Sequence, residues 1–236
     1  MASNIGDIRA KIPSRLQDAA ASLTATPGGD IDVAIQAAVA EYQREHPLEK
    51  AVRIAGTGAF KYAISGLTGF VDGFSGILGV AYPHLTTDQF LSFLESEEFG
   101  IVRDDSGAFL WFVSARPAST EFFLVVFTAP HVVSATTWTP PASDDEALAD
   151  LATAYCFQAL AGRYSQDTES SISADSMNRL TKAQEARANA RLWRENYQIK
   201  ISSGKAGSAA VAMGDIDRFF GTQQGHEYFF HGGRRH

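Results

Sequence analysis

A length of 236 residues fits one large domain or two small ones, and 45% hydrophobic with 20% charged residues is ordinary for a globular protein. The single cysteine, Cys156, excludes an internal disulfide and a thiolate-rich metal site, and its apolar neighbours favour a place in the core. The chain has no uncharged apolar run of about 18 residues and no basic, then apolar, N-terminus. We therefore expect no membrane span and no secretory signal, and synthesis in a cytoplasm.

The net charge of −7 is unevenly distributed. Residues 179–236 hold ten Lys or Arg and five Asp or Glu, a local charge of +5, so the rest of the chain carries −12. An acidic body disfavours tight phosphate contacts with nucleic acid, which require clustered Lys and Arg. The basic C-terminal end is either a docking segment or a tail whose charge only solvates it.

The N-terminal region, residues 1–47, is predicted to form a helical pair. Apolar residues recur at helical spacing between Asp7 and Thr26, where Pro13 either splits the helix or begins a second one. After the turn at 26–29, Asp30 is a candidate N-cap for a helix that ends at His46, before Pro47.

Residues 48–133 are predicted to form a β-rich insert, because β-branched and aromatic residues alternate there with glycines. We expect a small antiparallel β-subdomain with a short helix at Thr87–Leu94. Its predicted strands are a hairpin of 52–54 with 60–64, a strand at 77–82, a hairpin of 99–103 with 108–113, and a strand at 121–128.

Residues 134–201 are predicted to complete the helical bundle. Ser143 and Glu146 have capping-box spacing for a helix that runs to about Tyr164. After a polar linker, a second helix is expected at about 174–196, where small alanines allow close packing between helices. We predict subunit contacts at Ala183, Ala186 and Ala190.

Residues 202–236 are predicted to form an extended docking arm. Its first residues, 202–208, have the composition of a linker. The aromatic residues that follow are too many for a solvated tail and too few for a core of their own. They dock on a partner or fold back on their own β-subdomain. The predicted docking residues are Arg218, Phe219, Phe220, Tyr228, Phe229, Phe230, Arg234 and Arg235.

The sequence carries no recognisable catalytic, cofactor or metal motif. It lacks a metalloprotease helix, a nucleophile elbow and a phosphate-binding loop, and none of the six histidines pairs with another at metal-ligand spacing. Gly56-Thr57-Gly58 is interpreted as a turn, and His84 and His131, each after a proline, as turn residues. We expect no enzyme activity, cofactor or metal.

The order of helical pair, β-insert and helical pair resembles the head-to-tail connector (adaptor) proteins of long-tailed bacteriophages and gene-transfer-like particles. The matching stretches cover about two thirds of the chain and leave the C-terminal arm outside. They are Asp30–Tyr42, Asp72–Ser75 through Val80–Pro83, Phe127–Val133 and Asp145–Tyr197.

This resemblance implies an α+β fold, a helical bundle with an inserted antiparallel β-subdomain. It also implies a structural virion protein of the neck that forms a homo-oligomeric ring, twelvefold, between the portal protein and neck or tail-terminator proteins. DNA would pass through its channel without specific binding, and an acidic wall suits that role. The alternatives are another neck or tail-completion protein of the virion, or an enzyme or ligand-binding domain with a pocket in the β-subdomain.

Overall fold

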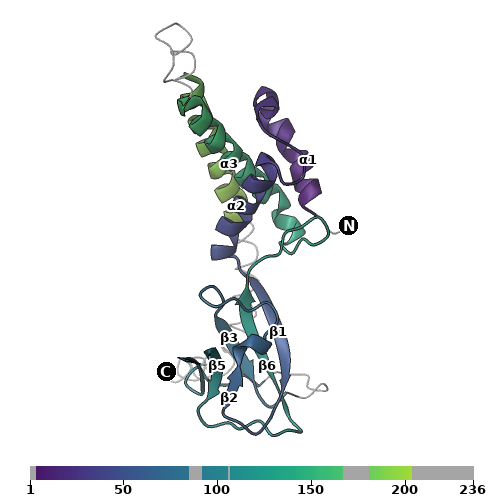
Figure 1. Ribbon diagram of the computed structural model, residues 1–236, viewed down its shortest axis with the longest axis vertical. Coiled ribbons are helices and arrows are strands. Elements are labelled where there is room, and N and C mark those ends of the chain that lie inside the picture. Colours follow the sequence, from purple (N-terminus) through teal and green to yellow (C-terminus); the bar gives the residue numbers. More distant parts are fainter. Residues whose placement is uncertain (1–3, 85–91, 106, 167–180, 204–236) are drawn as a thin grey trace, which may run out of the picture. The chain divides into compact units, whose positions relative to one another are not determined.

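The computed structural model describes residues 4–84, 92–105, 107–166 and 181–203. The fold is α+β, as predicted. The chain divides into two compact units, which we call the helical unit (Met1–Ala38 and Pro141–His236) and the β unit (Val39–Pro140). Described residues from both sides of the β unit, within 4–38 and 141–203, therefore belong to the helical unit, and the β unit is inserted between them in the sequence (Figure 1).

In the helical unit, helix α1 (Ile5–Leu16) buries one stripe of aliphatic residues, and a 3-10 turn (Gln17–Ser22) follows it. Asn4 caps α1 by accepting hydrogen bonds from the backbone of Gly6 and Asp7, while the Asp7 side chain accepts from the backbone N–H of Asn4. Pro13 lies inside the helix, so the prediction that it splits the segment or starts a new helix is wrong. A proline there removes one backbone donor, and the helix ends one turn later.

Helix α2 (Asp30–Glu45) has almost the predicted bounds and runs on into the β unit. Helix α3 (Asp145–Gln166) is buried on nearly all sides over its first three turns, where most of its side chains are small or aliphatic. The predicted capping box at its start is wrong. Ser143 lies in a 3-10 turn (Ala142–Asp144), and the Glu146 side chain binds α1 instead of the backbone of Ser143.

The last described helix spans residues 181–203, seven residues beyond the predicted end. The start of the predicted helix, 174–180, lies outside the described residues. The described part buries residues at three- and four-residue spacing, as a helix packed on one side does. These buried residues are Ala183, Ala186, Ala190, Tyr197 and Ile201.

The described residues of the β unit form two three-stranded antiparallel sheets. One has the order β1-β6-β3, with β1 at Leu48–Ala55, β6 at Phe122–Ala129 and β3 at Ile77–Ala81. The other has the order β2-β5-β4, with β2 at Lys61–Ala63, β5 at Gly107–Phe112 and β4 at Phe99–Asp104 (Figure 1). A short 3-10 turn, Ile64–Gly66, follows β2.

The core of the β unit is aromatic. Tyr62 and Phe112 from one sheet meet Phe123 from the other, with ring centroids 4.7–5.7 Å apart in edge-to-face arrangements. Such pairs contribute beyond the area they bury. The buried cluster comprises Tyr62, Ile64, Leu67, Val80, Leu110, Phe112, Phe123, Val125, Phe127 and Ala129.

Of the two predicted hairpins, the one formed by β4 and β5 is confirmed and the one around Gly56 is wrong. Strand β1 pairs with β6 along its whole length, whereas β2 pairs with β5 in the other sheet. A Cβ on Gly56 would lie 2.2 Å from the backbone oxygen of Ala118. Gly56 therefore permits a close backbone crossing as the chain leaves the first sheet.

The predicted helix at 87–94 lies mostly outside the described residues. Its described end does not form a helix, because Phe93 makes a bridge to Ala81 of β3. The Phe93 ring lies against Gly79, where a Cβ would come within 3.0 Å of it.

Candidate docking surfaces

The three alanines predicted as subunit contacts are covered by their own chain. Ala183, Ala186 and Ala190 are 2%, 5% and 4% exposed. They leave almost no surface for a neighbouring subunit to touch. The same helix exposes Leu192 (52%) and Ile199 (66%), which are two residues on from Ala190 and Tyr197 and therefore on the opposite face.

Replacing Ala190 with leucine is expected to destabilise the isolated chain by about 1–3 kcal/mol, because added methylene groups overpack a filled interior. Ala188 is exposed on the same helix, so Ala188→Leu should change stability by less than about 0.5 kcal/mol. Urea unfolding followed by far-UV circular dichroism measures both. Equal stability of the two variants would show that Ala190 has room around it.

The residues predicted for the docking arm, from Arg218 to Arg235, lie outside the described residues. Their roles stay predictions. The described residues show only the surfaces on which such an arm could dock.

A buried carboxylate joins three helices of the helical unit. Asp150 of α3 is fully buried, and its oxygens lie 3.2 Å from Nε of Arg15 and 2.5 Å from Nζ of Lys200. One turn earlier on α3, the more exposed Glu146 lies 2.7 Å from Nζ of Lys11 and 2.5 Å from Arg15. A buried charge is tolerated when it is paired, and the partners of Asp150 come from two other helices of the unit.

A second ion pair, between Arg9 of α1 and Asp32 of α2, stabilises the loop between these helices. Arg9 donates two hydrogen bonds of 2.6 Å to Asp32, which also accepts from the backbone N–H of Gly28 at 2.7 Å. The hydrogen bond from Arg9 lowers the pKa of the Asp32 carboxyl below its ordinary value. The contact is structural, because every partner belongs to the loop or to the two helices that flank it.

The Asp32 pair should make stability depend on pH. Because the pKa of Asp32 is lower in the folded chain than in the unfolded one, its contribution is complete above the ordinary value of about 4 and is lost as pH falls through the folded value. Asp32→Asn should therefore cost about 1.5–3 kcal/mol at pH 7. The difference between wild type and variant should shrink in urea titrations below about pH 4. A difference independent of pH would contradict this assignment.

In the β unit, His131 belongs to a packed cluster and not to an isolated turn. Its ring lies 3.0 Å from the Thr139 hydroxyl and 2.9 Å from the backbone oxygen of His46. The buried Tyr42 stacks on His46 with ring centroids 4.9 Å apart and lies 5.4 Å from His131. These contacts join the end of α2 to the segment after β6, so the cluster has a structural explanation.

The outer face of sheet β2-β5-β4 is aromatic, and two of the rings on it, Phe60 and Phe109, contact cations. Trp111 and Val113 are 41% and 60% exposed, and Phe60 stacks on Trp111 at 6.5 Å. The guanidinium of Arg116 lies 4.6 Å from the Phe60 ring centroid, and Nζ of Lys61 lies 3.9 Å from that of Phe109. Exposed aromatic and arginine side chains are typical of protein interfaces.

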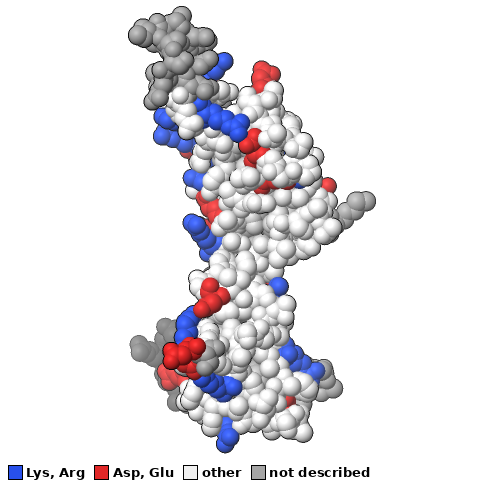
Figure 2. Space-filling view, in the orientation of Figure 1, with Lys and Arg blue, Asp and Glu red and all other residues white. Residues whose placement is uncertain are grey.

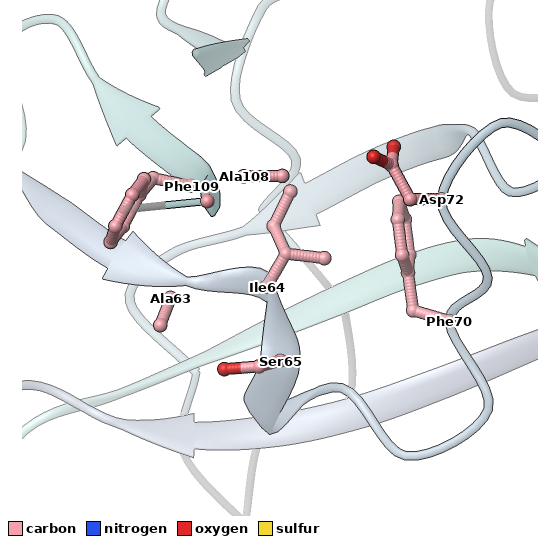
Figure 3. A pocket seen from close by; sticks show the side chains of 8 residues that line it. Ala63, Ile64, Ser65, Phe70, Asp72, Ala108 and Phe109 are labelled. Carbon is pink, nitrogen blue, oxygen red and sulfur yellow. The ribbon is translucent and has the colours of Figure 1, made fainter. Parts of the chain in front are cut away.

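A shallow pocket of about 240 Å³ opens beside this face. The Ile64 side chain lines the pocket between Phe109 of β5 and Phe70, and the Asp72 carboxylate lies at the pocket's edge (Figure 3). Arg103 of β4 lies 2.7 Å from Asp72, and both side chains are more than half exposed. We call these residues the Phe109 pocket; its lining is Ala63, Ile64, Ser65, Phe70, Asp72, Gly107, Ala108 and Phe109.

Reactive groups are few in the described part of the chain. It holds no cluster of three His, Cys, Asp or Glu residues able to bind a metal ion. Burial raises the pKa of the Cys156 thiol to about 12, so this cysteine is a poor nucleophile at neutral pH. Among the described helices, none is long and apolar enough to cross a membrane.

Charge is distributed differently over the two units. The 181–203 helix carries five Lys or Arg and two Glu. Figure 2 shows basic side chains over the part of the helical unit where Figure 1 draws this helix, and acidic and basic side chains together on the β unit. Among the described residues on the face that Figure 2 shows, the basic side chains do not form the broad basic surface that tight duplex binding requires.

Comparison with known protein families, curated proteins and solved structures finds no match to this chain.

Proposed function

We propose that the protein is a structural subunit of a connector (adaptor) ring at the head-to-tail junction of a tailed phage particle. The observation that carries this proposal is the chain order, in which a helical unit built from both ends of the chain holds an inserted β unit. That order is the feature through which the sequence resembles connector proteins. The proposed partners are copies of the chain, the portal protein and neck or tail-terminator proteins.

The described surfaces support an assembly role. Among the described residues, both units expose large apolar side chains, including Leu192 and Ile199 on one helix and Trp111 and Val113 on one sheet. Exposed apolar residues that gather on a single face mark interaction surfaces. The acidic excess of the chain is compatible with a channel through which DNA passes without specific binding.

The ring can be tested on the exposed face of the 181–203 helix. If copies of the chain contact each other there, Leu192→Glu with Ile199→Glu should reduce assembly with portal protein at least tenfold while leaving the chain folded, because a charge buried at an interface is costly. The matched control is Gln198→Glu, which adds a charge at an exposed position of the same helix. Sedimentation velocity measures assembly, and circular dichroism confirms folding. Unchanged assembly in the double variant would remove this face from the interface.

A different neck or tail-completion protein is the second candidate. Both candidates predict binding to a neck component, and they differ in copy number and position. Negative-stain images of particles with the chain labelled would separate a ring on the portal from a protein nearer the tail.

A further inference from the structure

We infer that the Phe109 pocket in the β unit is the binding site for the arm segment Asp217-Arg218-Phe219-Phe220 of this same protein. The inference goes beyond the connector proposal, because it concerns which surface of the chain receives the arm. It rests on the size of the pocket, the charges at its edge and the order of residues in the arm.

The pocket has the size and lining for one aromatic ring. Its volume is about 240 Å³, and its walls are mainly the apolar side chains of Ile64, Phe70, Ala108 and Phe109. An apolar cavity of about 150 Å³ is sufficient to bind benzene. Pockets for whole small-molecule ligands begin at about 300 Å³ and enclose most of the ligand. An open pocket of this size therefore fits a side-chain anchor better than a free metabolite.

The edge of the pocket supplies charge complementarity. Asp72 and Arg103 form an exposed ion pair there, 2.7 Å apart. In the arm, Asp217 and Arg218 immediately precede Phe219 and Phe220. With a phenyl ring in the pocket, Arg218 can pair with Asp72 and Asp217 with Arg103, which forms a four-charge network. Exposed pairs contribute little affinity but fix the register of a bound segment.

The second aromatic cluster of the arm fits less well. Tyr228-Phe229-Phe230 follows Glu227, and the nearest arginine, Arg234, is four residues away from the last ring. No Asp-Arg pair stands beside it. We therefore assign the pocket to residues 217–220 and leave the second cluster to another surface.

The arm is long enough to reach surfaces far from its origin. Thirteen residues, 204–216, separate Ser203, the last described residue, from Asp217. The fourteen Cα-to-Cα steps from Ser203 to Asp217 span up to about 45 Å at about 3.3 Å per step when the chain is extended. The pocket of the same copy and that of a neighbouring copy are both possible sites, and the experiment below distinguishes them.

Disulfide trapping in the full-length chain tests the inference. Ser65→Cys places a thiol on the exposed edge of the pocket, and Gly221→Cys places one directly after the two phenylalanines. The native Cys156 adds little background, because it is buried and its pKa is raised to about 12. The matched control replaces Ser65→Cys by Ser119→Cys, an exposed serine of the β unit that does not line the pocket.

We expect the 65–221 disulfide to form at least ten times more than the 119–221 disulfide under mild oxidation, as measured by peptide mass spectrometry. Adding Phe219→Ser and Phe220→Ser should abolish that preference, and Asp72→Lys should weaken it severalfold. Equal trapping at positions 65 and 119, or trapping that survives loss of both phenylalanines, would overturn the inference.

Mixing chains that carry only Ser65→Cys with chains that carry only Gly221→Cys separates the two possible sites. A linked dimer shows docking between copies. A link that forms only within doubly substituted chains also supports the pocket assignment, but contradicts the predicted docking of the arm on a neighbour. A chain that forms no ring but still traps the 65–221 link would refute the connector proposal and leave the pocket assignment intact.

Discussion

Replacing Asp150 with alanine is expected to lower the free energy of unfolding of the helical unit by about 3–5 kcal/mol, the usual cost of breaking a buried ion pair. Asp150 is fully buried and lies between Arg15 and Lys200. Removing its carboxylate leaves the partly buried Arg15 without this partner and opens a small cavity in α3. The lost ion pair and the cavity both lower the free energy of unfolding.

The control for Asp150 lies one turn away on the same helix. Glu146 binds Lys11 and Arg15, but its side chain is 55% exposed. Glu146→Ala should cost no more than about 1 kcal/mol, because solvent screens exposed pairs. Hydrogen-exchange mass spectrometry measures amide protection in the two units separately. The loss of protection caused by Asp150→Ala should therefore appear in α3 and not in the strands of the β unit. Equal costs at positions 146 and 150 would contradict the account of a buried network.

Phe123→Ala should lower the stability of the β unit by about 3–5 kcal/mol. The Phe123 ring is fully buried and packs edge-to-face on Tyr62 and Phe112, which come from the other sheet. Its removal leaves a cavity between the sheets that the surrounding rings can fill only in part.

Phe122 is the matched control for Phe123, because it is the same residue type on the opposite face of β6. Its ring is only partly buried, beneath the guanidinium of Arg53 at 3.6 Å. Phe122→Ala should cost about 1 kcal/mol, since an exposed cation–π contact contributes about 0.5–1 kcal/mol. Amide protection of β6 and β5 measures both variants. Similar losses would show that Phe123 is not central to the core.

Local patterns in the sequence predicted most of the elements but not how the strands pair. All six strands, β1 only in part, and helices α2 and α3 follow from apolar periodicity and from turn residues such as those at 104–107. The pairing of β1 with β6 joins residues about 70 positions apart and has no local signal. The composition around Gly56 predicts a hairpin, because turn residues are the same whether the chain returns or crosses to another sheet.

The surfaces were harder to predict than the fold. The run Phe109-Leu110-Trp111-Phe112-Val113 is apolar throughout, so periodicity could not show that alternate residues face solvent. The alanines of the last helix do not distinguish a subunit contact from the interior, because small residues allow close packing with any partner, including their own chain. The sequence holds one signal for the Asp150 network. Lys11 and Arg15 are one helical turn apart, and so are Glu146 and Asp150, so each pair lies on one face of its helix.

The measurement that tests the connector proposal most directly is native mass spectrometry of the purified full-length chain, alone and with the portal protein of the same particle. The proposal predicts a closed complex in which about twelve copies of the chain join the portal, as expected for a cyclic assembly. A chain that stays monomeric in both samples, or binds portal as a single copy, would contradict it.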